Sequence, residues 1–473
     1  MRRSTKEVTI RSIHEDGHLL RECAGRAMVS GRRICIVTPD IIGPINNGGI
    51  GTAYASLALV LADAGFGVDI LYTLGEVTEV GDIEHWITHY AERNVTLIPL
   101  PSRFHYEIDG PYELKRSYHV YRWLAGRDGA YSIVHFPDWC GLAFHSVMAK
   151  SLGEVLCDTE LCVGAHSPTQ WGMDGARRLL DRIEDLQTDY MEREAIRLAD
   201  VLISPSRYMV DWMMANGWSL PKRVIVQPNI MLEEDRPAVS DERTPIDEIV
   251  FFGRLEKRKG LHFFLRALSR SKISKRGDLS ITFLGKESAD DGKSSRDLIG
   301  LITHDWKCEV KIISNYGSGD ALKYLRGPRR LAVMPSLCDN SPYVVLECLT
   351  LQIPFLAARV GGVAELVAER DVGEVLFELN LGSIIGAVER VVDFGARSAR
   401  PALNNSDVTA SWVMWHGTAR PTSAPARAPT YAPLVTVCLV HFNRADLLTQ
   451  ALASLKAQTY RHLEVIVVDC SSS

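Results

Sequence analysis

Short apolar runs alternate with longer amphipathic stretches along most of the chain. In the first half, β-branched residues mark the predicted strands, which are RICIVT, VDILY, VTLIPL, SIVHF, LCVGAH, VLISPS and VIVQPN. Helical segments lie between several of them, and two clear ones are GTAYASLALVLADAG and RRLLDRIEDLQTDYMEREAIRLAD. Strands that are apolar almost throughout and alternate with helices indicate a parallel sheet with both faces covered.

The alternation stops and restarts twice. A polar, Pro-containing segment at 231–247 precedes a second set of strands, which are EIVFFG, LSITFLG, VKIIS, RLAVMPS, PFLAA and EVLF. A second linker, ARPTSAPARAPTYAP, is rich in Ala, Pro and Arg. It precedes a third set, formed by the strand VTVCLVHF, the helix RADLLTQALASLKAQ and the strand LEVIVVD.

This pattern predicts an α/β protein with two doubly wound, Rossmann-like lobes that face a cleft, plus an incomplete βαβ unit at the C-terminus. The predicted divisions are a poorly ordered leader (1–30), an N-terminal lobe (31–240), a C-terminal lobe (245–417), a linker (418–432) and a final fragment (433–473). A βαβ unit of about 40 residues buries too little surface to fold stably alone, so we expect the chain to end partway through a domain.

The composition excludes some classes of function. The chain has 473 residues, 46% of them hydrophobic, and a formal net charge of -5, which gives no bulk reason to expect a nucleic-acid partner. Its ten cysteines form no C-x-x-C pair and predict reduced thiols. No apolar run approaches the roughly 18–20 residues that span a bilayer, and the N-terminus lacks a signal-peptide core. We expect a cytoplasmic protein, and peripheral contact with the inner face of the membrane stays open.

A glycine-rich turn, NNGGIGT at 46–52, follows the first strand and opens the first long helix. Glycines there allow a close approach of the backbone to a ligand, and a helix N-terminus favours an anion. A dinucleotide fingerprint that began at Gly49 and Gly51 would need a third glycine where Tyr54 stands, which weakens an NAD site. A turn without a ligand remains the alternative.

A basic turn, FFGRLEKRKG at 251–260, follows the first strand of the second lobe. Arg254, Lys257, Arg258 and Lys259 give four cations in six positions. At the carboxyl end of a strand they favour a diphosphate, for which Arg supplies a fork and Lys a point charge. A solvated basic loop is the alternative.

The segment DNSPYVVLE at 339–347 lies where a strand gives way to a helix. Ser341 is a good N-cap and Pro342 a good first helical residue, so we expect the helix to begin there and to aim free N–H groups at the cleft. Asp339 precedes the cap and Glu347 follows it by about one and a half turns. Two carboxylates beside a phosphate site suit the hydroxyls of a sugar nucleotide, and the alternative is a capping or surface acid in each case.

These pieces resemble the retaining glycosyltransferases of family 4, which have the GT-B fold. The resemblance covers roughly residues 33–417 and is most specific at PSLCDNSPYVVLECLTLQIPFLAARVGGVAELV, which matches the family's E-x7-E motif. The other matching stretches are NNGGIGTAYASLALVLADAG, HFPDWCG, VGAHSP, SPSRYM, PNI and FFGRLEKRKG. The stretch WVMWH at 412–416 resembles the family's last helix, which crosses back onto the first lobe.

The resemblance implies roles for individual residues on the donor side. Arg254 and Lys259 would hold the donor diphosphate and Glu347 the ribose hydroxyls. Asp339 stands where the first motif glutamate usually contacts the donor sugar, and it reaches about one methylene less. The predicted donor-binding set is Gly49, Gly51, Arg254, Lys259, Asp339, Ser341, Tyr343, Val344 and Glu347.

On the other side of the cleft, His166 in VGAHSP matches a family histidine near the reacting sugar. It joins Arg254, Lys259 and Asp339 in the predicted catalytic set, although a histidine at a strand end is more often structural. Asp138 and Trp139 in HFPDW are assigned to the acceptor side.

The last segment, from PLVTVCLVHF to Ser473, resembles the start of family 2 glycosyltransferases, which have the GT-A fold. By that resemblance Asp469 would help to bind the nucleotide, Cys470 replaces a second acidic residue, and the metal-binding Asp-x-Asp strand would lie beyond the segment. We expect no activity from the segment alone.

The sequence therefore predicts a retaining glycosyltransferase that moves a sugar from a nucleoside diphosphate sugar to a glycan, lipid-linked or small-molecule acceptor. No cofactor and no metal are expected in the two lobes. The resemblance implies bacterial polysaccharide or glycoconjugate synthesis. Two alternatives stay open: a sugar-nucleotide epimerase on the same fold, and a degenerate module that binds a sugar nucleotide or glycan without catalysis.

Overall fold

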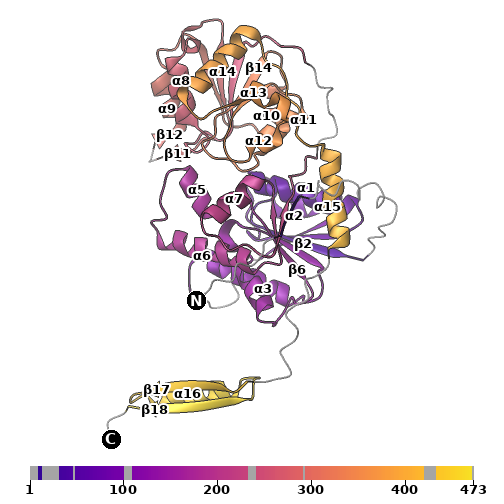
Figure 1. Cartoon of the computed structure of the whole chain (residues 1–473), viewed down its shortest axis with the longest axis vertical. Helices are drawn as coiled ribbons and strands as arrows, with labels where there is room; N and C mark the ends of the chain where they lie inside the picture. Colours follow the sequence, from indigo (N-terminus) through magenta and orange to yellow (C-terminus); the bar gives the residue numbers. More distant parts are fainter. Residues whose placement is uncertain are drawn as a thin grey trace. The chain divides into compact units, whose positions relative to one another are not determined.

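The computed structural model describes residues 9–12, 31–45, 48–100, 109–232, 241–290, 293–419 and 433–470. The chain divides into two compact units, Met1–Thr422 and Ser423–Ser473, and each is described by itself. The first unit holds two parallel sheets, one in each lobe (Figure 1).

The N-terminal sheet has eight parallel strands in the order β1-β8-β7-β6-β5-β2-β3-β4. The strands are β1 (Thr9–Ser12), β2 (Arg33–Thr38), β3 (Gly67–Tyr72), β4 (Val95–Pro99), β5 (Ile133–Pro137), β6 (Glu160–Gly164), β7 (Val201–Ser204) and β8 (Arg223–Val226). Because the chain runs outward in opposite directions from β2 and β5, the topological switch point lies between these two strands.

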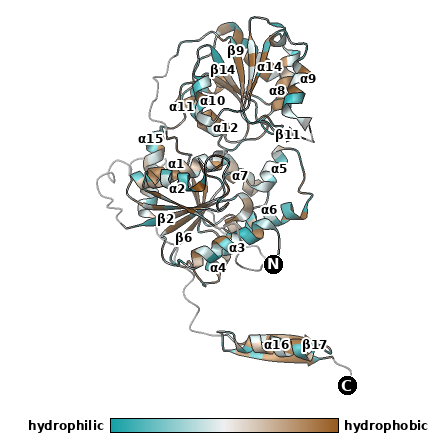
Figure 2. Cartoon of the chain, turned by 180° about the vertical axis from the view of Figure 1, so that it is seen from behind, coloured by the Kyte–Doolittle hydropathy of each residue, from teal (hydrophilic) through white to brown (hydrophobic). Residues whose placement is uncertain are grey.

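Helices cover both faces of this sheet. They are α1 (Gly49–Asp63), α2 (Ile83–Ala91), α3 (Tyr112–Ala125), η2 (Trp139–Gly141), α4 (Phe144–Ser151), α5 (Thr169–Gly175), α6 (Ile183–Leu198) and α7 (Arg207–Ala215). Successive residues of β2 point to opposite faces, so Ile34 and Ile36 join one core cluster while Cys35 and Val37 join the other. Figure 2 shows the resulting apolar strands between helices whose colouring is mixed.

The C-terminal sheet has six parallel strands in the order β13-β10-β9-β14-β15-β16, which is the Rossmann order. The strands are β9 (Glu248–Phe252), β10 (Ser280–Leu284), β13 (Glu309–Ile313), β14 (Arg330–Met334), β15 (Phe355–Ala358) and β16 (Leu376–Phe377). A short antiparallel pair, β11 (Ala289–Asp290) and β12 (Lys293–Ser294), lies outside this sheet. The helices are α8 (Leu261–Arg270), η3 (Ile273–Lys275), α9 (Ser295–Thr303), α10 (Ser318–Leu325), α11 (Tyr343–Thr350), α12 (Val363–Leu366), α13 (Glu369–Val375) and α14 (Leu381–Phe394).

The second unit is a βαβ element formed by β17 (Val435–His441), α16 (Ala445–Lys456) and β18 (Leu463–Asp469), with the two strands parallel. No residue of α16 is buried, and apolar side chains of β18 such as Ile466 and Val468 are exposed. The element forms, but within the described residues it has no core of its own.

The predicted fold class is confirmed, and some details of the predicted elements are wrong. The predicted helix RRLLDRIEDLQTDYMEREAIRLAD begins only at Ile183. In EVLF, Glu374 and Val375 close helix α13 and only Leu376 and Phe377 pair as a strand. Residues 9–12, expected in a poorly ordered leader, form strand β1 because the edge of β8 offers backbone partners. The remainder of 1–30, residues 233–240 of the first linker and 420–432 of the second lie outside the described residues.

The last helix of the first unit, α15 (Asn405–Thr418), packs on the N-terminal sheet, as the resemblance implied (Figure 1). Val408, Trp412 and Trp415 join the same core cluster as Ile34 and Ile36. The indole N–H of Trp412 donates to the carbonyl of Pro228 at 2.8 Å. The chain therefore crosses between the lobes twice.

A buried histidine pair fastens α15 to strand β5. His416 Nδ1 lies 2.7 Å from the carbonyl of Trp412, so Nδ1 carries the proton and Nε2 is left as an acceptor. His135 Nε2 lies 2.9 Å from it and is the donor. Burial lowers the pKa of His416 to about 4, and burial together with His416 and His166 lowers that of His135.

This pair predicts acid sensitivity of the folded state. The folded pKa of each imidazole lies below the unfolded value near 6.5, so its contribution to stability is complete above that value and is lost as the pH falls toward 4. We expect the melting temperature to drop between pH 7.5 and 5, and the drop to shrink by a few degrees in His416→Gln. An identical pH dependence in the variant would contradict the prediction.

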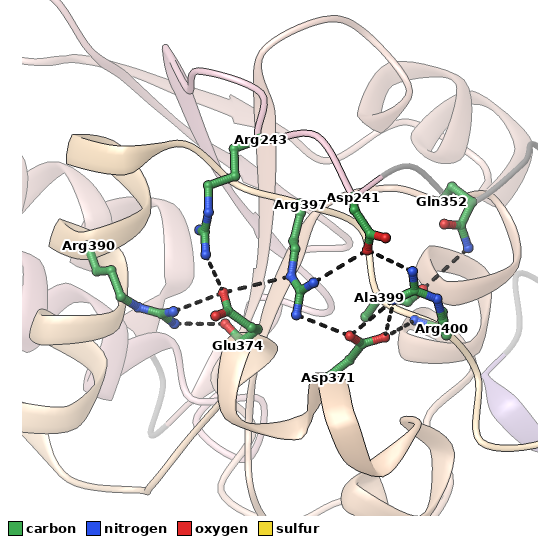
Figure 3. Close-up of polar contacts among 9 residues, drawn as sticks. All are labelled: Asp241, Arg243, Gln352, Asp371, Glu374, Arg390, Arg397, Ala399 and Arg400. Atoms are coloured by element: carbon green, nitrogen blue, oxygen red, sulfur yellow. Dashed lines mark hydrogen bonds and ion pairs between the residues drawn. The ribbon is translucent and has the colours of Figure 1, made fainter.

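Ion pairs tie together the two segments that cross between the lobes (Figure 3). Thr244, in the first crossing, pairs with Ala396 in the second through two backbone hydrogen bonds. Asp371 is 1% exposed and accepts from Arg397 and Arg400 at 3.1 and 3.3 Å. The network in Figure 3 extends to Asp241, Arg243, Glu374 and Arg390.

Removal of the central carboxylate should destabilise this junction. Asp371→Asn removes the buried carboxylate partner of Arg397 and Arg400, which then keep only exposed Asp241 and the more distant Glu374. We expect a loss of about 2–4 kcal/mol of unfolding free energy, measured by denaturant titration. Asp241→Asn is the matched control: its side chain is 69% exposed, so the midpoint should hardly move. Equal effects of the two substitutions would show that burial of Asp371 is irrelevant.

Candidate functional site

Several predicted site residues lie just beyond the carboxyl ends of strands. In the N-terminal lobe Gly49 opens helix α1 after β2, Asp138 follows β5, and His166 comes two residues after β6. In the C-terminal lobe the loops after β9 and β14 carry Lys259 and Asp339. Strands β2 and β5, and strands β9 and β14, flank the switch points of the two sheets, where open α/β sheets bind ligands.

The basic turn packs directly against the loop after β14. The N–H of Leu337 donates to the carbonyl of Arg258 at 2.8 Å. Gly260 has φ +84°, and a Cβ there would lie 1.9 Å from the carbonyl oxygen of Pro335. Glycine at 260 is thus required both by the backbone conformation and by the neighbouring chain.

Lys259 and Asp339 form an ion pair across these two loops, with Nζ 2.7 Å from Oδ2. Burial raises the pKa of Asp339, but Lys259 and then Arg258 outweigh it, so the pKa lies below its usual value. Asp339 is therefore a carboxylate at neutral pH. The structure brings together one predicted diphosphate ligand and the predicted sugar contact.

The other cations of the turn surround an acid. Arg254 Nη2 lies 3.3 Å from Oε1 of Glu256, and Arg258 Nη2 lies 3.1 Å from the same atom. The side chain of Arg254 is 54% exposed, so this ion pair contributes little and can open. Arg254 is accessible to a ligand.

Helix α11 begins one residue later than predicted. Its first residue is Tyr343, Pro342 is the capping residue with an extended ψ of 125°, and no side chain caps the helix. Ser341 is instead approached by Asn229 of the other lobe, whose Nδ2 lies 3.4 Å from its hydroxyl. The predicted Ser341 cap is wrong because contacts across the lobes fix this residue.

The start of α11 packs against the start of α1. Tyr343 donates its hydroxyl hydrogen to the carbonyl of Ile230 at 3.2 Å and joins a small cluster with Ala53 and Met231. A Cβ on Gly49 would lie 3.6 Å from the ring of Tyr343. The side chain of Tyr343 is thus committed to the contact between the lobes, and an anion at this helix end would meet the N–H groups of Tyr343 and Val344.

Two further predicted donor residues lie deeper. Glu347 is in the second turn of α11 and is 9% exposed. Gly51 is buried in the first turn of α1. The structure does not test the roles of these residues, which stay predictions.

His166 lies beside α1, with its ring 5.3 Å from that of Tyr54 in an edge-on contact. Burial lowers the pKa of His166 to about 4, so the imidazole is neutral at physiological pH. The ring borders a cavity of about 30 Å³, which has room for about two water molecules. Trp412 and Asn229 also line this cavity, but the basic turn does not.

Asp138 is a structural anchor of the acceptor-side loop. Its carboxylate accepts from the backbone N–H groups of Trp139 at 2.8 Å and Ser167 at 3.1 Å. Burial raises the pKa of Asp138 to about 7 although these N–H groups oppose the shift. The neighbouring Glu192 holds the N–H groups of Cys140 and Thr169 in the same way. Trp139 is 39% exposed and is the residue of this loop that can meet an acceptor.

Two polar residues that follow strand ends were not predicted from the sequence as part of the site. Asp40 follows β2 by two residues. Burial raises its pKa to about 6, although the N–H groups of Gly48 and Gly51 and the charge of Arg254 act to lower it. Asn340, inside the quoted motif, is 4% exposed and hydrogen-bonds to the other lobe. The position of Asp40 at a switch-point strand was a usable signal, whereas nothing in the sequence identified the partners of Asn340.

Comparison with protein families agrees with this geometry. The model of the glycosyl transferase 4-like domain matches residues 48–229, and the model of the glycosyl transferases group 1 matches residues 233–402. The chain therefore contains a glycosyl transferase 4-like domain followed by a group 1 glycosyl transferase domain. The model of glycosyl transferase family 2 matches residues 436–473, which is the βαβ unit.

The part of the chain that these two domains form has distant relatives. Alpha-D-kanosaminyltransferase from Streptomyces kanamyceticus is 24% identical over 49% of the chain and 61% of its own length. Among solved structures, sucrose-phosphate synthase from Thermosynechococcus elongatus is similar with a TM-score of 0.59 at 16% identity, over 82% of this chain and 96% of that one. Anabaena HepE, solved in complex with UDP-glucose, has a TM-score of 0.53 at 14% identity, over 90% and 100% of the two chains.

These likenesses confirm the GT-B fold. The chain spans about three-fifths of the length of the curated relative named above. Within the part of the chain that the structure describes, no helix combines the length and the apolar character needed to cross a bilayer.

The close approach at Gly260 gives a direct test of the geometry. Gly260→Ala should displace the basic turn, destabilise the fold by roughly 2 kcal/mol or more and abolish nucleotide binding, since the added methyl meets the Pro335 carbonyl. Gly300→Ala in α9 is the control, because a Cβ there has no atom within 4 Å. Thermal unfolding with and without UDP or GDP measures both effects, and unchanged binding in Gly260→Ala would contradict the assignment.

Proposed function

We propose that the first unit transfers a sugar, with retention of configuration, from a nucleoside diphosphate sugar to a glycan, lipid-linked or small-molecule acceptor. The observation that carries the proposal is the ion pair between Lys259 and Asp339 at the carboxyl ends of β9 and β14. It sets a phosphate-binding cation beside a sugar-binding carboxylate. Arg254 and the start of α11 belong to the same pair of loops.

The donor would lie along these loops. The diphosphate carries negative charge, so Arg254 and Lys259 would hold it, aided by the N–H groups at the start of α11. The ion pair orients Lys259, whose side chain is still 17% exposed and can share a second anionic partner. Asp339 would accept hydrogen bonds from sugar hydroxyls, and Glu347 from the ribose.

Catalysis would be mainly electrostatic. Departure of the nucleoside diphosphate builds negative charge on its terminal phosphate, which Lys259 and Arg254 stabilise from fixed positions. Contact between the lobes would exclude water from the reacting sugar. His166 would remain neutral near the reaction centre because burial lowers its pKa to about 4.

Several parts of this proposal rest on the resemblance alone. They are the retaining outcome, the independence from metals and cofactors, the cytoplasmic location with contact at the membrane face, and a role in bacterial polysaccharide synthesis. Two similar proteins support a sugar nucleotide as donor: one is a kanosaminyltransferase, and another was solved with UDP-glucose.

A degenerate binding module is the second candidate, and one residue favours it. Asp339 replaces the usual glutamate and is already paired with Lys259, so its reach toward a sugar is reduced. Such a module would bind a nucleoside diphosphate sugar and transfer nothing. A sugar-nucleotide epimerase would instead convert the donor in the absence of any acceptor.

The donor site is tested by thermal-shift titration with UDP, GDP, dTDP and ADP. Binding to the folded state should raise the melting temperature in proportion to ligand occupancy, and Arg254→Ala/Lys259→Ala should lose the response to the base that binds. Lys272→Ala/Arg276→Ala is the control: both side chains bond Asp393 and come just before β10, at the opposite end of the sheet.

The outcomes separate the candidates. A shift with one base that only the first double variant loses would support the donor site, and product analysis with the matching sugar nucleotide would then distinguish transfer from epimerisation. If none of the four nucleotides raises the melting temperature, the donor-site assignment is contradicted. Binding without turnover over a broad acceptor panel would favour the degenerate module.

A further inference from the structure

One buried amide joins the candidate donor loop to the candidate acceptor lobe. Asn340 Nδ2 donates to the carbonyls of Ala165 and His166, each at 2.9 Å. Its Oδ1 accepts from the hydroxyl of Ser206. With 4% of its surface exposed, Asn340 has three of its hydrogen-bonding positions filled by the opposite lobe.

These partners stand at functional positions. Ala165 and His166 follow β6, and Ser206 caps α7, where its hydroxyl oxygen accepts from the N–H of Met209. Asn340 itself comes directly after Asp339. One side chain therefore fixes the main chain at His166 relative to the carboxylate of the donor loop.

The surrounding backbone leaves little freedom at this point. A Cβ on Gly362 would lie 2.2 Å from the carbonyl oxygen of Asn340 and 2.7 Å from Cβ of Ser206. A Cβ on Gly361, whose φ is +56°, would lie 1.7 Å from the carbonyl oxygen of Asp339. The two glycines let the turn after β15 press the donor loop against α7.

Only an amide fits the three partners. The carbonyls of Ala165 and His166 need donors, whereas the hydroxyl of Ser206 offers one. An aspartate at 340 would turn a negative oxygen toward two carbonyl oxygens in a buried place. An alanine would remove the donor to both carbonyls and would leave the Ser206 hydroxyl with its Met209 contact alone.

We propose that Asn340 is a positioning residue for the transfer reaction: it fixes the position of His166 relative to Asp339 when the lobes are in contact. This inference rests on the proposed function. It assigns Asn340 no contact with substrate; its effect passes through the main chain of His166 and through the neighbouring Asp339.

A second contact between the lobes serves as an internal control. The carboxylate of Glu365, in α12, accepts from the backbone N–H groups of Arg207 and Tyr208, each at 2.8 Å. Glu365 thereby caps α7 from the other lobe, where a negative charge suits the helix N-terminus. It makes no hydrogen bond with His166 or Asp339 among the described residues.

The kinetic test compares Asn340→Ala, Asn340→Asp and Glu365→Ala in the full chain, using the sugar nucleotide found by the binding screen. For Asn340→Ala we expect kcat to fall roughly 10- to 100-fold with the donor KM within about threefold, because positioning acts on the transition state. Glu365→Ala should lose less than threefold in kcat. Asn340→Asp should recover activity as the pH is lowered, because a protonated carboxyl can donate again.

A second readout does not need turnover. In protein with ¹³C-labelled histidine, the His166 ring signal, assigned by its absence in His166→Gln, should shift in Asn340→Ala and stay in place in Glu365→Ala. If wild type transfers no sugar, the proposed function fails, while this shift still supports the positioning of His166. An unmoved His166 signal, or a kcat of Asn340→Ala equal to wild type per folded molecule, would overturn the inference.

Discussion

The site depends on one constraint, the parallel pairing of β9 with β14. Arg330 lies opposite Glu248 in this pairing, so both strands end at the same edge of the sheet and release their loops side by side. Lys259 and Asp339 are 80 residues apart in sequence and meet at 2.7 Å only because of that register. A shift of the register by one residue would turn every side chain of one strand to the other face and separate the pair.

Several carboxylates are buried, and three kinds of partner offset the free-energy cost of removing them from water. Asp339 has an ammonium partner, which keeps it ionised. Asp371 has two guanidinium groups at the junction of the crossings. Asp138 and Glu192 have only neutral N–H and hydroxyl donors, and burial raises the pKa of both. The difference in pKa fits the proposed roles, because Asp339 would meet a ligand as an anion, whereas Asp138 and Glu192 hold the backbone of loops.

The sequence predicted the strands and the two lobes, because both follow from local apolar runs. It also predicted that site residues gather at strand ends, because parallel sheets bind ligands there. The cap of α11 could not be predicted, since Ser341 is an ideal cap by local preference and is drawn to Asn229 by a contact 112 residues distant. Strand β1 was missed because a four-residue edge strand depends on its neighbour β8 more than on its own sequence. Asn340 was not predicted because its three hydrogen-bond partners are distant in sequence, and a polar residue in a loop gives no local sign of them.

The segment Asp339–Tyr343 contacts both the basic turn of its own lobe and the other lobe. Asp339 faces the basic turn of its own lobe, while Asn340, Ser341 and Tyr343 bond Ala165, Asn229 and Ile230 of the other. Because these residues are consecutive and the helix that follows is rigid, a ligand that moves Asp339 must strain the contacts beside it, and a change in the contact between lobes must move Asp339. Coupling of this kind needs no relay through the protein, since the proposed donor contact and the contact between the lobes occupy the same five residues.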